Sequence, residues 1–166
     1  MVSFPLITIV RQRVDVNIYD EFFSIIKQLN AANIKYAVVG GIALSFHVEP
    51  RYTKDIDFLV LSSCIDDLKS ILKSMHYTFE AQPWTFKNAN ITLHRLTKIE
   101  GEDSLTIDML EATEEQHVRI IENAIREKTE YGFVCIATRE DLIWMKRLRN
   151  SKQDIADIEA LENDKD

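Results

Sequence analysis

The stretch Lys35–Val60, KYAVVGGIALSFHVEPRYTKDIDFLV, decides the fold. Its first part, Tyr36–Val39, is a short apolar and β-branched run, which predicts a buried strand. The pair Gly40 and Gly41 interrupts that run and opens a helix. A second predicted strand, Thr53–Val60, follows a proline and carries two acidic residues. The stretch therefore predicts a strand, a glycine turn, a helix and a second strand in immediate succession.

The second strand presents two carboxylates on one face. Side chains alternate along a strand, so Asp55 and Asp57 share a face, about 7 Å apart by the rise per residue. Ile56, Phe58 and Val60 form the opposite, core-facing set. A hard cation such as Mg²⁺ is usually held by one or two carboxylates together with substrate phosphates. Two such ions about 4 Å apart can clamp a phosphoryl group during in-line displacement.

Gly40 and Gly41 supply the complementary anion site. Glycine lets the backbone approach a ligand closely, and the helix that follows points free N–H groups at an anion. A phosphate cradle beside a metal-binding edge is therefore the functional interpretation. The structural alternative is a tight turn at the glycines and a solvated acidic strand edge at Asp55 and Asp57.

This pattern resembles the signature of the nucleotidyltransferase superfamily, which contains DNA polymerase beta, aminoglycoside and lincosamide nucleotidyltransferases, and AbiEii-type toxins. Gly40-Gly41 stands thirteen residues before the Asp-Ile-Asp triplet at 55–57, which has apolar flanks. The text GGIALSFH, followed by RYTKDID, looks most like the small bacterial AbiEii-like and antibiotic-modifying branches. The resemblance is clearest over residues 35–60 and extends more loosely to about residue 161.

The resemblance implies a set of catalytic residues. Asp55 and Asp57 would be ligands of Mg²⁺ (or Mn²⁺), and Gly40 and Gly41 would contact the triphosphate. Asp108 looks like the third carboxylate of the family, both a metal ligand and the general base for the acceptor hydroxyl, on a strand beside Asp55 and Asp57. Asp108 lies among apolar neighbours in a predicted strand, where an unpaired charge is costly, so it needs a cation or a basic partner.

Four further residues are candidates for binding the nucleotide. Ser45 lies one helical turn past Gly41 and would replace the serine that follows the first glycine in much of the superfamily. Arg51 and Thr53 resemble residues that hold the loop or the nucleotide, with a solvated turn as the alternative. Lys146 resembles a helix lysine that reaches the phosphates. Its alternative is a basic helix face paired with the next helix, where Lys152, Asp154 and Asp157 stand.

The order of elements predicts an α/β (α+β) fold, a mixed β-sheet flanked by helices. We expect one domain over residues 1–166, with residues 1–16 as an arm or an edge strand and a C-terminal helical pair over 138–162. The expected helices span about 17–32, 42–47, 62–75, 114–126, 138–150 and 152–161. The expected strands span 36–39, 53–60, 77–79, 85–86, 91–96, 104–111 and 130–136. This arrangement matches a minimal nucleotidyltransferase core.

The amino-acid composition limits the classes of function that this protein can have. The 166 residues are 46% hydrophobic with a net charge of −7, which argues against a chain built mainly to coat nucleic acid. The cysteines, Cys64 and Cys135, have no metal-ligand spacing and are expected to be reduced thiols. No stretch approaches the ~18 apolar residues that span a bilayer, and no basic leader precedes the first apolar residues, so a cytoplasmic protein without membrane contact is expected.

The sequence thus predicts a Mg²⁺-dependent nucleotidyltransferase that moves an NMP from an NTP to an acceptor hydroxyl and releases pyrophosphate. The acceptor would be a small molecule, a tRNA or a protein, with the acidic net charge favouring the non-nucleic-acid classes. The short chain suggests that a homodimer or a protein partner completes the pocket. The alternative is a non-catalytic nucleotide- or partner-binding module of a toxin–antitoxin-type system. A carboxylate-metal phosphohydrolase or nuclease is a third class, but it leaves the glycine pair unexplained.

Overall fold

The computed structural model describes residues 17–164, in which eight strands form one sheet. The predicted arm or edge strand over residues 1–16 lies outside the described residues. The helices are α2 (Ile18–Ala31), α3 (Gly40–His47), α4 (Ile65–Ser74), α5 (Glu115–Asn123), α6 (Arg139–Arg149) and α7 (Lys152–Asn163). The strands are β1 (Tyr36–Val39), β2 (Asp55–Leu61), β3 (Phe79–Glu80), β4 (Trp84–Phe86), β5 (Ile91–Glu100), β6 (Asp103–Ala112), β7 (Ile125–Thr129) and β8 (Gly132–Ile136).

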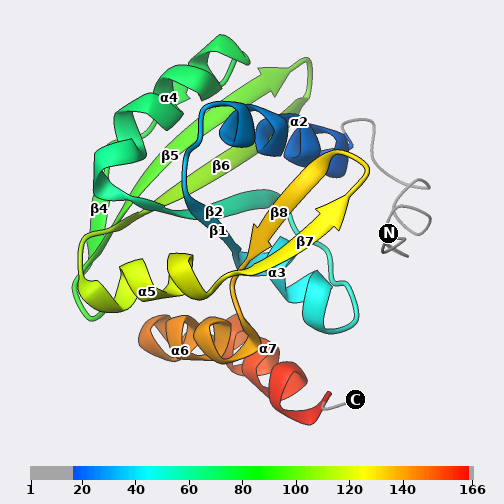
Figure 1. The fold of residues 1–166 in the computed structure, drawn as a ribbon, viewed down its shortest axis with the longest axis vertical. Helices are drawn as coiled ribbons and strands as arrows, with labels where there is room; N and C mark the ends of the chain where they lie inside the picture. Colours follow the sequence, from blue (N-terminus) through cyan, green and yellow to red (C-terminus); the bar gives the residue numbers. More distant parts are fainter. Residues whose placement is uncertain (1–16, 165–166) are drawn as a thin grey trace.

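The sheet is mixed, as predicted, and its order is β3-β5-β6-β2-β1-β8-β7, with β4 paired to β5. Strand β1 runs antiparallel to β2 and parallel to β8. Strand β2 runs parallel to β6, which in turn is antiparallel to β5. Figure 1 shows α6 and α7 (orange and red) side by side at one end of the sheet, next to α3 and α5. This end of the sheet holds the candidate site.

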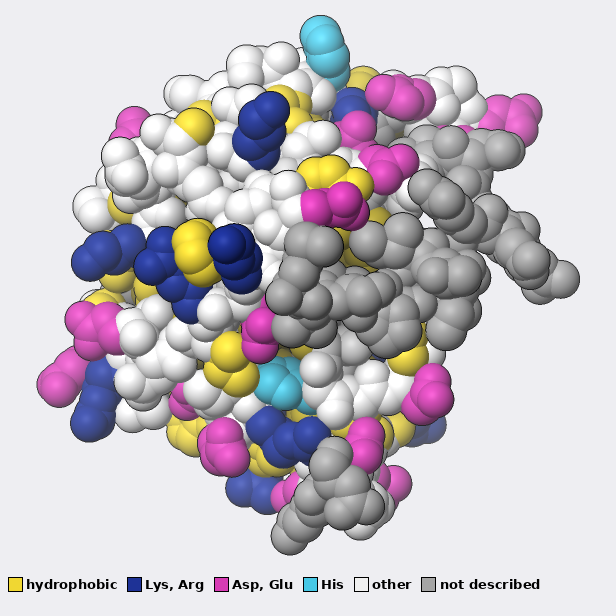
Figure 2. Space-filling view, turned by 45° about the vertical axis from the view of Figure 1, so that its right-hand side comes forward, with side chains coloured by type: hydrophobic (Ala, Val, Ile, Leu, Met, Phe, Trp, Pro, Cys, Tyr) yellow, Lys and Arg dark blue, Asp and Glu magenta, His cyan; other side chains and the backbone are white. Residues whose placement is uncertain are grey.

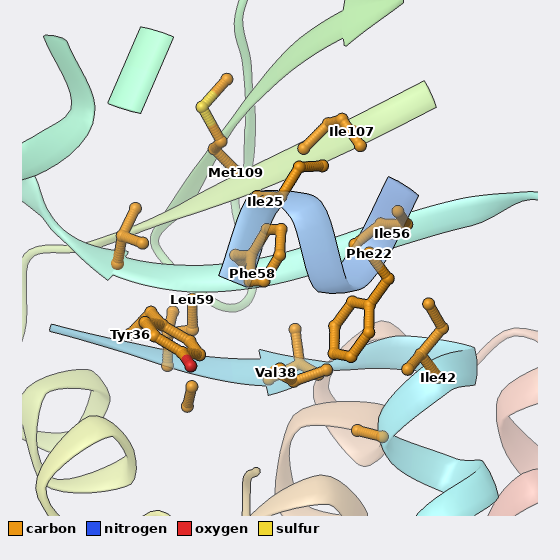
Figure 3. Packing of buried hydrophobic residues seen from close by; sticks show 14 of the residues in the cluster. Phe22, Ile25, Tyr36, Val38, Ile42, Ile56, Phe58, Leu59, Ile107 and Met109 are labelled. Atoms are coloured by element: carbon orange, nitrogen blue, oxygen red, sulfur yellow. The ribbon is translucent and has the colours of Figure 1, made fainter. Parts of the chain in front are cut away.

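The core lies between the sheet and helix α2. Phe22 of α2 stacks on Phe58 of β2 with ring centroids 6.3 Å apart. Figure 3 shows Phe22 and Ile25 against the apolar side chains of β2, with Ile107 of β6 close by. Phe22, Ile25, Phe58 and Ile107 are all fully buried. This burial confirms the core face predicted for the second strand, and it turns Asp55 and Asp57 to the opposite side of the sheet.

Polar side chains cap the starts of α2, α6 and α7. The Asn17 side chain accepts a hydrogen bond from the backbone of Tyr19 at the start of α2. Thr138 accepts one from the backbone of Asp141 at the start of α6. Ser151 opens α7 in a reciprocal capping box. Such caps satisfy backbone N–H groups that have no partner within the helix.

The helix expected over residues 62–75 begins three residues later than predicted. Ser62–Cys64 form a 3₁₀ turn, and α4 begins only at Ile65 without a side-chain cap. The Ser62 hydroxyl instead donates to the Glu111 carboxylate of β6 at 2.6 Å. A long-range partner therefore outcompetes the local helix terminus for this side chain.

The predicted helix over 114–126 is too long. Helix α5 ends at Asn123, and Ile125–Thr129 form strand β7, which pairs antiparallel with β8. The turn between these strands is closed by the Thr129 hydroxyl, which donates to the Gly132 carbonyl at 2.7 Å. Strand β7 is the sheet edge among the described residues, so its polar residues can face solvent and give no apolar strand pattern.

The surface is mixed in charge. Figure 2 shows acidic, basic and hydrophobic side chains interspersed on one face of the molecule. Among the described helices, none has the length and apolar character needed to cross a membrane.

Candidate active site

Two of the three predicted carboxylates meet across neighbouring strands. Asp57 of β2 and Asp108 of β6 are register partners, and Asp55 is opposite Thr106 on the same pair of strands. All three acidic side chains line one pocket with a volume of about 580 Å³. Asp108 is only 3% exposed, whereas Asp55 and Asp57 are half-buried. The parallel β2–β6 ladder therefore brings together three carboxylates that are up to 53 residues apart in the sequence.

The glycine pair packs directly on this site. Gly40 has φ +69°, and a Cβ at that position would overlap the Asp57 carboxylate. A Cβ at Gly41 would come within 2.7 Å of the Thr53 hydroxyl oxygen. Both glycines therefore let the start of α3 lie against the residues of β2 and the loop before it. This close packing is compatible both with a tight structural turn and with a cradle for a ligand.

The carboxylates repel one another. Burial, followed by the charges of Asp108 and Asp55, raises the pKa of Asp57 to about 7, against the lowering effect of Arg149 and Lys146. Burial and the Asp108 charge likewise raise the pKa of Asp55. In the described part of the chain, no side chain or backbone group hydrogen-bonds to the carboxylate of Asp55 or Asp57. A cation beside these two side chains would relieve the repulsion.

Asp108 has a basic partner that the sequence interpretation left unnamed. Arg95 of β5 donates from Nε and Nη2 to the two oxygens of Asp108, at 2.7 and 2.8 Å. The same guanidinium lies 5.2 Å from the ring centroid of Trp84 on β4. Arg95 also lines the pocket. The pairing follows from the β5–β6 register, in which Arg95 is opposite Asp108, and that register could not be read from the sequence.

The donor set fits a hard cation in part. Mg²⁺ and Mn²⁺ prefer carboxylate oxygens, and Asp55 and Asp57 offer carboxylates without hydrogen-bond partners. Across residues 17–164, however, no group of three or more His, Cys, Asp or Glu side chains is arranged to hold a metal ion. The third predicted ligand, Asp108, has both of its oxygens engaged by Arg95. The three carboxylates predicted as metal ligands are therefore gathered at one place, two of them without hydrogen-bond partners and one paired with Arg95.

Arg51, Thr53 and Lys146 all line the pocket, and α7 anchors two of them, Arg51 and Lys146. Arg51 donates from Nε and Nη2 to the two oxygens of Asp157, each at 2.9 Å. The buried Lys146 donates from Nζ to Asp157 at 2.7 Å. The Thr53 hydroxyl donates to the backbone carbonyl of Asp55 at 3.3 Å. The loop before β2 is thus fixed to α7 through Asp157, which also holds Lys146 of α6.

Ser45 is not brought into the pocket. Ser45 is not among the described residues that line the pocket. The buried hydroxyl of Ser45 donates to the Gly41 carbonyl at 3.0 Å. His47 ends α3, and its Nε2 lies 2.9 Å from the carbonyl oxygen of Ala137. These contacts describe local structural roles for both side chains.

The acidic residues of α7 pair with α6, as the structural alternative stated. Asp154 accepts two hydrogen bonds from Arg149, at 2.6 and 2.8 Å, and one from the Ser151 hydroxyl. Lys152 is exposed and takes no part in this pairing. Arg149, which the sequence interpretation missed, lines the pocket near Asp57. Its signal was the basic run Lys-Arg-Leu-Arg at 146–149, of which only Lys146 was singled out.

The pocket is basic although the chain is acidic. Six Lys or Arg residues and four Asp residues line it, whereas the whole chain carries a net charge of −7. The basic set is Arg51, Lys54, Lys87, Arg95, Lys146 and Arg149. Trp84 and Phe86 of β4, with Ile91 and Leu93 of β5, add an apolar wall. Such a pocket suits an anionic ligand that carries a planar or apolar portion.

Comparison with known proteins identifies one family. A family model described as "Nucleotidyl transferase AbiEii toxin, Type IV TA system" matches residues 26–163. This match covers more than half of the chain and includes the glycine pair, the three aspartates and both C-terminal helices. No functionally curated protein matches the sequence significantly.

Several solved structures share the fold. The lincomycin-bound lincosamide antibiotic adenylyltransferase LnuA has a TM-score of 0.58 and 12% identity, with 86% of this chain and 95% of that chain covered. A putative nucleotidyltransferase from Thermotoga maritima has a TM-score of 0.58 and 14% identity, with coverages of 83% and 87%. ANT(2″)-Ia in complex with adenylyl-2″-tobramycin has a TM-score of 0.54 and 14% identity, with 86% of each chain covered. These identities establish the likeness of fold alone.

Proposed function

The chain belongs to the AbiEii nucleotidyltransferase family, and on that premise we propose that it transfers an NMP from an NTP to an acceptor hydroxyl, with Mg²⁺ (or Mn²⁺) and release of pyrophosphate. The observation that carries this proposal is the placement of Gly40 against Asp57, which is itself opposite Asp108. One small region thus combines a helix start that can approach phosphates with the unpartnered carboxylates of Asp55 and Asp57, which can take a cation.

The triphosphate would lie between the start of α3 and the basic residues of α6. Backbone N–H groups at the beginning of a helix attract anions, and Gly40 and Gly41 leave room for close approach. Lys146 and Arg149 stand across the pocket and already lower the pKa of Asp57 through their charge. Both basic side chains are held by acidic residues of α7, so their positions are fixed before a ligand arrives.

Asp55 and Asp57 would hold the divalent cation, which when bound neutralises phosphate charge and polarises the α-phosphoryl group. Asp108 would take the proton of the acceptor hydroxyl. In that step the acceptor oxygen forms a bond to the α-phosphorus, the bond to the pyrophosphate oxygen breaks, and the hydroxyl proton passes to Asp108. Positioning and charge neutralisation supply most of the rate in such transfers.

The acceptor would enter along the wall formed by Trp84 and Phe86, and it would be a hydroxyl of a small molecule, a tRNA or a protein. The excess of basic over acidic side chains in the pocket lining weakens the argument that overall acidity makes against an RNA acceptor. The family description names a toxin of a type IV system, so we also propose an antitoxin protein as the partner. Because the proposed substrate is an NTP, we also propose a cytoplasmic location.

The alternative, a non-catalytic binding module, is less well supported by this geometry. A module that only binds a partner gains nothing from the repelling carboxylates of Asp55, Asp57 and Asp108, and one that binds a nucleotide with its cation has no need of the third. Their repulsion destabilises the fold. An enzyme that places a cation there does gain from them. The gathering of three carboxylates in one pocket therefore favours catalysis.

Thermal unfolding with each of the four NTPs, with and without Mg²⁺, tests the binding step. A ligand that binds only the folded state stabilises it by about 2.7 kcal/mol at a hundredfold excess over Kd. We expect one or more NTPs to raise Tm only with Mg²⁺, and the Asp55→Asn/Asp57→Asn variant to lose the effect. The Asp66→Asn/Asp67→Asn variant, which removes the same charge from the exposed surface of α4, should keep it. No Mg²⁺-dependent shift with any NTP would contradict the proposal.

A further inference from the structure

Arg95 pairs with Asp108 and lines the same pocket as Asp55 and Asp57. Resting on the proposed function, we propose that Arg95 is a positioning residue that withholds Asp108 from the cation and the acceptor until nucleotide phosphates take over its guanidinium. The observation behind this is that the third carboxylate of the site is paired by a side chain that itself lines the ligand pocket.

The resting pair is set by the sheet. Arg95 and Asp108 are register partners in the antiparallel β5–β6 ladder, so their side chains leave the sheet side by side. The guanidinium gives two hydrogen bonds, at 2.7 and 2.8 Å, and so uses both oxygens of Asp108. The Asp108 side chain is only 5% exposed. A buried carboxylate without a counter-charge is strongly destabilising, so Asp108 keeps Arg95 until another cation replaces it.

Arg95 can change partners without leaving its strand. Its side chain is 36% exposed, which contrasts with the buried carboxylate that it holds. The Trp84 ring lies 5.2 Å from the guanidinium and would remain beside it after a short side-chain movement. Phosphate oxygens accept the same two-bond pattern from a guanidinium as a carboxylate does. A nucleotide in the pocket thus offers Arg95 an equivalent partner.

The exchange is balanced in charge. When the guanidinium passes from Asp108 to a phosphate, Asp108 gains the cation held at Asp55 and Asp57 as its new counter-charge. Neither Arg95 nor Asp108 is then buried without an opposite charge. Asp157 differs from Asp108 in this respect. It is held by two basic side chains, Arg51 and Lys146, and it lies on α7 rather than among the carboxylates of the sheet. The exchange makes tight cation binding depend on the nucleotide.

Binding of Mn²⁺ to the full chain, measured by electron paramagnetic resonance, tests this dependence without any turnover. The wild type should bind Mn²⁺ alone weakly, and a non-hydrolysable NTP analogue should tighten that binding at least tenfold. Arg95→Met should bind Mn²⁺ alone at least tenfold more tightly than the wild type and should gain less from the analogue. Arg95→Lys, which keeps the charge but not the two-bond pattern, should lie between them.

Three controls separate the specific exchange from a general charge effect. Arg149→Met removes a positive charge from the same pocket but not from Asp108, and should change Mn²⁺ binding by less than Arg95→Met does. Arg126→Met removes an arginine that lies 3.9 Å from the Phe133 ring, on the β7–β8 hairpin, and should match the wild type. Adding Asp108→Asn to Arg95→Met should remove the gain in affinity.

The outcomes distinguish this inference from the proposed function. If Arg95→Met binds Mn²⁺ alone no more tightly than the wild type, or if Arg149→Met gains as much, the inference is overturned. Nucleotide binding by the same proteins would then still support a nucleotidyltransferase. If the wild type binds neither the analogue nor Mn²⁺ in the analogue's presence, the proposed function itself fails.

Discussion

Asp57 of β2 lies directly opposite Asp108 of β6 in a parallel pair of strands, on the face of the sheet away from the packed core. In this parallel pair, each residue of β2 lies beside its register partner on β6. The two carboxylates therefore meet without help from any loop. The pairing of the two strands therefore sets the positions of both carboxylates. Their closeness explains why mutual repulsion adds to burial in raising the pKa of Asp57 to about 7.

Asp57→Asn should stabilise the metal-free protein near neutral pH. The folded-state pKa of Asp57, about 7, exceeds the unfolded value of about 3.9, so the folded state holds the proton more tightly. The contribution of protonated Asp57 to the free energy of unfolding is therefore fully present below about pH 4 and is lost as the pH rises through 7. Above that pH the contribution no longer changes. Urea unfolding between pH 4 and 8 should show this fall in the wild type and a smaller one in Asp57→Asn. An equal pH dependence in both proteins would show that Asp57 does not titrate as stated.

Gly40→Ala should cost more stability than Gly101→Ala, although both glycines have similar positive φ angles of +69° and +62°. At Gly101 nothing lies within 4 Å of an added Cβ, so only backbone strain of about 1–2 kcal/mol applies. At Gly40 the new Cβ overlaps the Asp57 carboxylate, which adds ~1–3 kcal/mol of crowding. Chemical denaturation measures both. Gly40→Ala should also lose Mg²⁺-dependent NTP binding, while Gly101→Ala retains it.

Asp157→Asn should destabilise the protein by about 3 kcal/mol, because it leaves the buried Lys146 and the bidentate Arg51 without their shared counter-charge. Arg147→Ala, which removes an exposed ion pair between the same two helices, should cost less than about 1 kcal/mol. Equal losses in the two variants would show that Asp157 is no more than a surface contact.

Asp157 should also affect how the free energy of unfolding changes in acid. Burial alone would raise the pKa of Asp157, but hydrogen bonds from Arg51, Lys146 and Gln153 outweigh it and lower that pKa to about 2. Because the folded value lies below the unfolded value of about 3.9, this contribution is present above pH 4 and is lost as the pH falls toward 2. Urea titrations at pH 2 to 5 should show a smaller acid loss for Asp157→Asn than for the wild type.

The central stretch of the fold could be predicted because its signals are local. The apolar run Tyr36–Val39, the glycine pair and the alternation around Asp55–Asp57 each depend on residues a few positions apart. The caps at Thr138 and Ser151 are local for the same reason. Strand β7 was missed because an edge strand faces solvent and needs no apolar pattern, so Arg-Glu-Lys resembled a continuing helix.

The partners of the site residues could not be predicted, since they depend on distant register and docking. The Arg95–Asp108 pair requires the β5–β6 register, and the Arg51–Asp157 pair joins residues 106 positions apart. The sequence pattern placed Arg51 and Lys146 near the nucleotide but did not show that Asp157 holds both. It also suggested Ser45 as a phosphate contact, whereas the structure turns that hydroxyl onto the Gly41 carbonyl.

Transfer of label from an [α-³²P]NTP tests the central claim most directly. The protein would be incubated with Mg²⁺, each NTP in turn, and a bacterial lysate separated into small-molecule, RNA and protein fractions. We expect α-label to appear in one acceptor fraction together with pyrophosphate, and to be absent with Asp55→Asn/Asp57→Asn but present with Asp66→Asn/Asp67→Asn. Release of inorganic phosphate from [γ-³²P]NTP with no α-label in any fraction would contradict a nucleotidyltransferase and indicate a phosphohydrolase.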